Sequence, residues 1–308
     1  VFWGLVYSFE LLYFLSWLIY KRFPKTKPAI LIHVLAFVGI ISLGYAYFIE
    51  PYWIDVHHVH IKSPKFKNTS LILVQISDLH CDEKIRNERK VVEIINDIQP
   101  DVVVFTGDAL NTDEALVTFQ ETLSAVKASL GKFAVRGNFD VCFWRNFDFF
   151  GNTGFAELNG TSVTLTKNGS KITISGLSAV SHISDFLFLH QIPVDHYSIF
   201  LYHYPGINEE CGDAPVDLFL SGHTHGGQIA LPFYGALVTL SKYGKKYESG
   251  YYDSGGKILY VNRGIGMEGG LAPRVRFWAR PEITVFHIEP VKKNEEDNKY
   301  SQQSKNLI

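Results

Sequence analysis

The sequence predicts an α/β sandwich, and three features indicate it. Eight short apolar runs rich in β-branched and aromatic residues recur between residues 71 and 288. Two stretches with apolar residues at helical spacing lie among the first of these runs. Acidic, histidine and amide residues stand directly after several of the runs. Early helices followed by strand-rich sequence are typical of a sandwich in which helices cover sheets.

The first fifty residues precede this pattern and are much more apolar. Residues 1–20 and 29–49 contain one acidic or basic side chain each, Glu10 and His33. Because an α-helix rises ~1.5 Å per residue, about 20 residues cross a hydrocarbon core of roughly 30 Å. We therefore expect residues 1–50 to form a transmembrane helical hairpin in contact with a lipid bilayer. The basic loop at 21–28 and the lysines among residues 62–67 favour opposite orientations.

Composition divides the rest of the chain into three parts. Residues 51–69 are interpreted as a linker with a solvated histidine cluster, for which a metal site is the alternative. Residues 70–290 carry the strand pattern and form the main domain. Residues 291–308 lack apolar periodicity and are expected to be a disordered polar tail.

The predicted elements of the main domain follow in chain order. A helix is expected over residues 84–98, where apolar side chains recur at mostly helical spacing until Pro100 stops it. A second helix is expected over residues 116–130. The eight predicted strands are 71–77, 101–106, 132–136, 171–176, 197–202, 216–221, 258–262 and 283–288.

Composition excludes several classes of protein. With 46% hydrophobic residues and a net charge of −2, the 308-residue chain is not disordered throughout. The same balance argues against a strongly basic protein that binds nucleic acid. Its three cysteines are scattered and form no CxxC pair, so neither a disulfide framework nor a cysteine zinc site is expected.

Polar residues with ligand chemistry follow the strands. Beyond the strands come the motifs SDLH, TGDALN, RGNFD, LYHYP and SGHTHGGQ, which contain Asp78, His80, Asp108, Asn138, His203, His223 and His225. In open α/β sheets, sites lie beyond the carboxyl ends of the strands, so we expect these side chains to share one site. Carboxylate, imidazole and amide ligands suit Mn²⁺, Fe or Zn²⁺. Two such ions about 3.5–4 Å apart can clamp a phosphoryl group.

This ordered series resembles the calcineurin-like metallophosphoesterase superfamily over roughly residues 70–290. The resemblance implies a four-layer α/β/β/α sandwich with two mixed sheets and two divalent ions, Mn²⁺ first and Fe or Zn²⁺ as alternatives. One ion would be bound by Asp78, His80, Asp108 and His225, and the other by Asp108, Asn138, His203 and His223. Asp108 would bridge the ions, and Asp108, Asn138 and His223 are also assigned to catalysis.

The motifs GHTHGGQ, VNRGIGMEGG and ARPEI are similar to those of a membrane-associated bacterial branch of that superfamily. The branch contains extracytoplasmic phosphodiesterases and a UDP-2,3-diacylglucosamine pyrophosphatase of lipid A synthesis. The resemblance implies the bacterial inner membrane as location. A UDP-linked substrate would require the catalytic domain on its cytoplasmic side.

One residue departs from the family pattern. The family places histidine after GN, where it helps to protonate the leaving oxygen, whereas this chain has Phe139. Either catalysis is impaired, or the leaving group needs no proton. A phosphate that leaves from a pyrophosphate has a second pKa of ~6 and departs as an anion at neutral pH. We interpret Phe139 as support for pyrophosphate cleavage.

Other side chains are candidates for substrate binding. Arg263, after a predicted strand, is expected to bind a diphosphate, and Gln228 to contact substrate beside the metals. Aromatic residues after GNFD form either an acyl-chain groove or part of the core; they are Phe143, Trp144, Phe147, Phe149 and Phe150. Asp140 is expected to cap a turn.

The leading hypothesis is a membrane-anchored hydrolase that cleaves a lipid-linked pyrophosphate. The first candidate substrate is the acylated nucleotide sugar UDP-2,3-diacylglucosamine, cleaved to UMP and 2,3-diacylglucosamine 1-phosphate. The enzymatic alternative is an outward-facing phosphodiesterase or phospholipid-headgroup hydrolase. A metal-binding scaffold without activity is the third hypothesis, and Phe139 motivates it.

Overall fold

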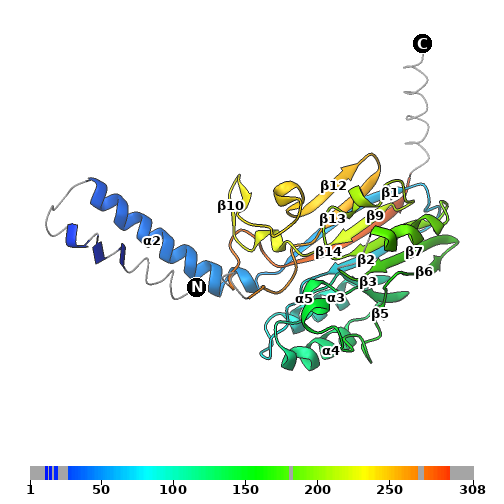
Figure 1. The fold of residues 1–308 in the computed structure, drawn as a ribbon, viewed down its shortest axis with the longest axis horizontal. Helices are drawn as coiled ribbons and strands as arrows, with labels where there is room; N and C mark the ends of the chain where they lie inside the picture. The colour runs from blue at the N-terminus through cyan, green and yellow to red at the C-terminus, as the bar shows by residue number, and fades with distance from the viewer. Residues whose placement is uncertain are drawn as a thin grey trace, which may run out of the picture.

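Two six-stranded mixed sheets form the body of the molecule (Figure 1). The computed structural model describes residues 11–12, 14–15, 17–19, 27–179, 183–269 and 274–291. The first sheet has the order β1 (Asp55–Ser63), β14 (Glu282–Pro290), β2 (Leu71–Ile76), β3 (Val102–Phe105), β4 (Gly131–Ala134) and β5 (Ala156–Glu157). The second has the order β12 (Gly250–Ser254), β13 (Lys257–Val261), β9 (Leu218–Ser221), β8 (Tyr197–Tyr202), β7 (Ser170–Leu177) and β6 (Thr161–Lys167).

Three apolar layers hold the sheets and helices together. The middle layer lies between the sheets and contains Leu73 and Val104 from the first and Ile199 and Leu220 from the second. Strands β3, β8 and β9 are buried along their whole length, as expected for strands covered on both faces. All eight predicted strand segments coincide with strands of the two sheets.

Helices cover the outer faces of the sheets. Against the first sheet pack α3 (Glu88–Ile98) and α4 (Leu116–Ala125), which bury side chains such as Val91 and Phe119. Both predicted helices are present, although each is shorter than expected. Against the second sheet pack η3 (Ile183–Gln191) and α6 (Ile207–Glu210). Short elements complete the fold: η1 (Glu50–Tyr52), η2 (Asp113–Ala115), α5 (Asn138–Phe143), η4 (His225–Gly227), β10 (Ala230–Leu231), β11 (Gly235–Ala236) and η5 (Gly244–Tyr247).

The predicted transmembrane hairpin is not supported. In the ranges that the structure describes, no helix meets the length and apolarity needed to cross a bilayer. Most of the first predicted segment lies outside those ranges, and the second coincides with α2 (Lys27–Phe48). The end of α2 packs on the main domain, where Ala46 is buried and its carbonyl accepts a hydrogen bond from the Arg276 amide. The prediction of an inner-membrane location is wrong on this finding.

The predicted linker is also wrong, because residues 55–63 form a strand of the first sheet. Strand β1 runs parallel to β14 with Val59 opposite Phe286. From His58 onward its exposed residues alternate with buried ones, so Val59 and Ile61 face the core while His58 and His60 face outward. The polar residues on the outer face of this edge strand interrupt its apolar pattern, so the sequence did not predict a strand here. The predicted tail, residues 291–308, lies outside the described residues except for Val291.

Candidate metal centre

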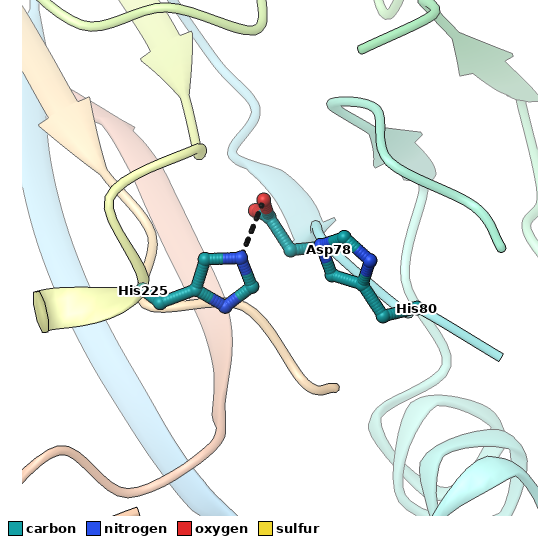
Figure 2. Close-up of side chains that lie close together, drawn as sticks. All are labelled: Asp78, His80 and His225. Atoms are coloured by element: carbon teal, nitrogen blue, oxygen red, sulfur yellow. Dashed lines mark ion pairs between the residues drawn. The ribbon is translucent and has the colours of Figure 1, made fainter. Parts of the chain in front are cut away.

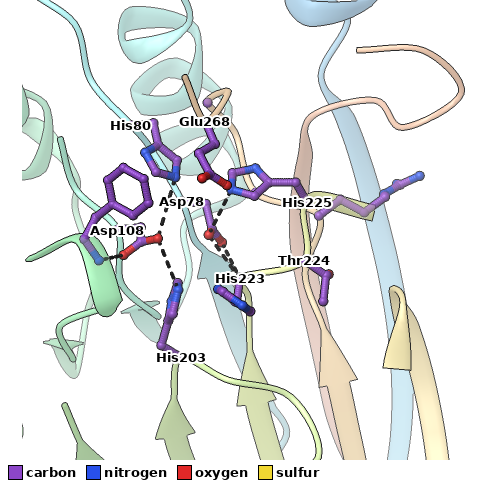
Figure 3. A network of polar contacts seen from close by, with 12 residues as sticks. Asp78, His80, Asp108, His203, His223, Thr224, His225 and Glu268 are labelled. Atoms are coloured by element: carbon purple, nitrogen blue, oxygen red, sulfur yellow. Dashed lines mark hydrogen bonds and ion pairs between the residues drawn. The ribbon is translucent and has the colours of Figure 1, made fainter. Parts of the chain in front are cut away.

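The loops that follow the strands bring the predicted ligand residues together at one edge of the two sheets (Figure 3). Strands β2, β3 and β4 of the first sheet precede Asp78, Asp108 and Asn138. Strands β8 and β9 of the second sheet precede His203 and His223. The site therefore lies where the carboxyl ends of parallel strands from both sheets meet, as expected for this class of fold.

Two groups of three potential ligands form within this cluster. Asp78, His80 and His225 make up the first, shown in Figure 2, and Asp108, His203 and His223 make up the second. Within each group the ligand atoms lie within 4.8 Å of one another. The Asp108 Oδ2 atom is 3.7 Å from His80 Nε2 and 3.2 Å from His203 Nε2. Its carboxylate thus lies between the two groups.

The cluster has buried polar atoms that lack hydrogen-bond partners among the described residues. These atoms are both ring nitrogens of His80, Nε2 of His203 and Oδ1 of Asn138. Buried polar groups are nearly always hydrogen-bonded, and each exception needs an explanation. Metal ions would supply the missing partners, so the donor set fits two divalent ions.

Neighbouring groups orient the ligands. The Nδ1–H group of His203 donates to the Thr106 carbonyl at 2.8 Å, which leaves Nε2 free to face the site. The Nε2–H group of His223 donates to the Leu240 carbonyl at 3.4 Å. Such contacts select the tautomer and ring orientation that a metal requires.

Asp140 fastens two of the ligand loops together. Its carboxylate accepts hydrogen bonds from the amides of Asp108, Ala109 and Gly137 at 2.8–2.9 Å. Gly137 is required there, because a Cβ atom would lie 2.1 Å from Asp108 Oδ1. The expectation that Asp140 caps a turn is confirmed, and the same bonds position Asp108.

The ligands occupy strained backbone conformations. Positive φ angles occur at six non-glycine residues of the site: Asp78 (49°), His80 (39°), Asp108 (60°), His223 (73°), His225 (53°) and Gln228 (55°). Such conformations cost energy and cluster at functional sites, where the surrounding structure enforces them. The strain is invisible in the sequence.

Burial controls the charge state of the site. It lowers the pKa of His80 and of His223 to about 4 and that of His225 well below its usual range, so these rings remain neutral and able to bind metal. Burial would raise the pKa of Asp108, but His203 beside it lowers that pKa to about 2. The Asp108 carboxylate in turn raises the pKa of His203 to about 10 against the effect of burial, so a metal ion must displace a proton from Nε2 of His203 to bind there. Burial raises the pKa of Asp78 to about 7.

The raised pKa of Asp78 predicts that metal affinity depends on pH. Because Asp78 is protonated in the metal-free site below about pH 7, a metal ion must displace this proton to bind. Because binding also displaces the His203 proton, we expect the affinity for Mn²⁺ to fall about tenfold per pH unit above pH 7 and about a hundredfold per unit below it. Isothermal titration between about pH 8 and pH 6 measures this dependence, and a slope no steeper below pH 7 than above it would contradict the assignment of Asp78.

Arg276 supports the loops around the ligand cluster, a buried role that its place in the sequence does not reveal. Its guanidinium is fully buried. The Nε–H group donates to the Gly266 carbonyl at 3.0 Å, and an Nη1–H group donates to the Ala279 carbonyl at 2.8 Å. The Gly266 amide in turn donates to the Asp78 carbonyl at 2.7 Å. Arg276 therefore positions the loop that packs against Asp78.

Replacing Arg276 by methionine is expected to lower the free energy of unfolding by about 3–5 kcal/mol, because several buried carbonyls lose their donor. Urea denaturation measures this change. Arg280→Met is the matched control, since Arg280 pairs with Asp55 at the surface and its loss should cost about 1 kcal/mol or less. Equal losses in both variants would argue against the role of Arg276.

The two predicted substrate-binding residues differ in their surroundings. Gln228 is buried and lines a cavity with His223 and His225, and its Oε1 atom has no hydrogen-bond partner among the described residues. Arg263 instead donates to Glu282 and, at 2.7 Å, to Asp55. These two ion pairs favour a structural role for Arg263 under the ligand loops.

Two further residues complete the surroundings. Glu268 lines the same cavity as Gln228, and burial together with Asp108 raises the pKa of its carboxyl (Figure 3). Its only signal in the sequence is its place in the VNRGIGMEGG motif. The ring of Phe139 lies edge-on to that of His80, with 5.0 Å between the ring centroids.

Comparison with known proteins agrees with this geometry. The profile of the family described as calcineurin-like phosphoesterase matches residues 72–227, which span every ligand named above. The chain belongs to this family. The metallophosphoesterase YkuE of Bacillus subtilis, described as uncharacterized, is 36% identical over 80% of this chain and 89% of its own length.

Two other relatives of this calcineurin-like phosphoesterase carry names that specify an activity. The UDP-2,3-diacylglucosamine pyrophosphatase LpxG of Chlamydia trachomatis is 27% identical over 80% of this chain and 93% of its own. The phosphodiesterase YaeI of Escherichia coli is 26% identical over the same shares. The family and these relatives support a metal-dependent hydrolase of phosphoric esters or pyrophosphates.

Proposed function

We propose that this protein hydrolyses a lipid-linked pyrophosphate with two divalent metal ions, Mn²⁺ being the first candidate. The observation that carries the choice of a pyrophosphate is Phe139, whose apolar ring lies beside His80 where the family has an imidazole. Phenylalanine cannot donate a proton to a leaving group. A departing phosphate needs none at neutral pH, because its second pKa is ~6.

The proposed substrate is UDP-2,3-diacylglucosamine, the compound named in the description of LpxG, and the pathway is lipid A biosynthesis. The products would be UMP and 2,3-diacylglucosamine 1-phosphate. The 27% identity to LpxG supports this choice, and the similarity to YaeI supports a phosphodiesterase as the second candidate.

Each group of ligands would hold one of the two metal ions. Asp78, His80 and His225 would hold one ion, and His203, His223 and Asn138 the other, with Asp108 shared. When bound, two such ions lower the pKa of an attacking water and neutralise charge on the phosphoryl group. The chain itself orients these ligands through the Thr106 carbonyl and Asp140, and Gln228 faces the cavity where the substrate would lie.

A substrate comparison tests the proposal. Purified protein with Mn²⁺ is incubated with UDP-2,3-diacylglucosamine or with bis(4-nitrophenyl) phosphate, and the products are separated by chromatography. We expect UMP and the lipid monophosphate to form, and chelation of the metal to stop the reaction. Hydrolysis of the nitrophenyl diester alone would reject the pyrophosphate in favour of a phosphodiesterase.

A further inference from the structure

An apolar hairpin stands directly beside the metal centre. The residues from Ile229 to Leu240 contain the short strands β10 and β11 and border a cavity of about 520 Å³. The metal-centre residues His223 and His225 line this cavity. Ile229, Leu237, Val238 and Leu240 line it as well. We call this cavity the hairpin groove.

The hairpin exposes many apolar side chains in a short stretch. Val238 is 60% exposed and Leu240 is 66% exposed. Leu231, Phe233, Tyr234 and Leu237 are also exposed. Single exposed apolar residues are ordinary, but a contiguous set beside a cavity marks a binding surface.

The backbone holds these side chains in place. The Ala236 amide donates to Glu248 Oε2 at 2.5 Å, and the Lys245 ammonium group donates to the Ala236 carbonyl at 3.0 Å. Phe233 and Leu240 have positive φ angles of 65° and 53°, which these side chains rarely adopt. The hairpin is thus built to present its apolar side chains rather than to bury them.

The hairpin groove is continuous with the metal centre. The Leu240 carbonyl, on the groove wall, accepts a hydrogen bond from the His223 ring. A phosphoryl group held at the ligand cluster would therefore extend one of its substituents along Leu237, Val238 and Leu240. Water-exposed apolar walls favour an apolar substituent, since each buried methylene contributes up to ~0.8 kcal/mol.

We propose that the hairpin groove binds an apolar chain carried by the phosphoester substrate. This inference rests on the proposed function, because it assumes that phosphoryl transfer takes place at the ligand cluster. It moves the acyl-chain site away from the aromatic residues after GNFD, of which Phe149 and Phe150 are core residues of the first sheet. Phe143 alone of the five is strongly exposed.

Two matched substrates test the proposal. Methyl and octyl 4-nitrophenyl phosphate share a leaving group that needs no acid, and both are used below their micelle concentrations with the Mn²⁺-loaded full chain. We expect kcat/KM for the octyl ester to exceed that for the methyl ester by at least about tenfold. The ratio of the two is insensitive to a loss of folded protein.

Substitutions in the hairpin groove test whether the preference for the octyl ester arises there. The double substitution Leu237→Ser and Val238→Ser is expected to bring the octyl-to-methyl ratio close to one. Val194→Ser is the control, since Val194 is exposed and precedes β8, whereas the site lies beyond the end of β8. This control should keep the wild-type ratio. A ratio near one in the wild-type protein, or a high ratio that survives the double substitution, would overturn the inference.

The outcomes separate this inference from the proposed function. A high octyl-to-methyl ratio that the double substitution abolishes, without release of UMP from UDP-2,3-diacylglucosamine, would reject the pyrophosphate as substrate and support the hairpin groove as a binding site for an apolar chain. Release of UMP together with an octyl-to-methyl ratio near one would support the pyrophosphate as substrate and overturn the proposal that the hairpin groove binds an apolar chain. Absence of turnover on all three compounds with Mn²⁺ overturns both.

Discussion

Replacing Asp108 by alanine is expected to lower metal-dependent turnover by at least about a thousandfold. The Asp108 carboxylate lies between the two ligand groups, with Oδ2 within 3.7 Å of His80 Nε2 and 3.2 Å of His203 Nε2. Its removal would affect both ions at once, while loss of a histidine removes a ligand from only one. Turnover and bound metal, measured on the same preparation, should fall together.

The matched control for this variant is Asp213→Ala. Asp213 carries an exposed carboxylate that pairs with His190 next to α6. It should keep wild-type turnover and metal content. Near-normal turnover in the Asp108 variant, with a circular dichroism spectrum equal to that of the wild type, would refute the assignment of the site.

Introducing histidine at position 139 is expected to separate substrates by their leaving groups. A correctly placed general acid contributes about 10²–10⁴-fold when the leaving oxygen needs a proton. We therefore expect Phe139→His to raise turnover of an unactivated dialkyl phosphate by about a hundredfold or more. Turnover of UDP-2,3-diacylglucosamine should change by less than about threefold, since the departing phosphate needs no acid.

Phe143→His controls for a nonspecific effect of a new imidazole. The ring of Phe143 lies 5.3 Å from that of Phe139 and is largely exposed. This variant should change neither activity by more than about twofold. A large gain on the pyrophosphate in the Phe139 variant would show that the wild-type enzyme lacks an acid it needs, and would count against the proposed substrate.

The fold was predictable where strands are buried on both faces. The runs VVVF in β3 and YSIFLY in β8 are buried at every position and apolar at all or nearly all of them, as strands covered on both faces require. Strands with one polar face were missed, including β1, where histidines alternate with Val59 and Ile61. The apolar character of residues 29–49 led to a wrong prediction, because the contacts of Ala46 with the main domain depend on tertiary structure.

The ligand cluster was predictable because each ligand follows a strand in a recognisable motif. The supporting groups were not, since their roles arise from contacts between distant segments. Arg276 acts through the carbonyls of Gly264, Gly266 and Ala279. The Leu240 carbonyl, at the end of the hairpin, orients His223. The hairpin groove has no motif either, because exposed leucine and valine are indistinguishable in sequence from buried ones.

The metal stoichiometry of the purified chain tests the proposed dinuclear centre most directly. Metal-free protein is titrated with Mn²⁺ and followed by electron paramagnetic resonance, which distinguishes isolated ions from an exchange-coupled pair. We expect two equivalents of Mn²⁺ to bind, with a coupled spectrum that Asp108→Ala abolishes. Binding of a single uncoupled ion would contradict a dinuclear centre built around Asp108.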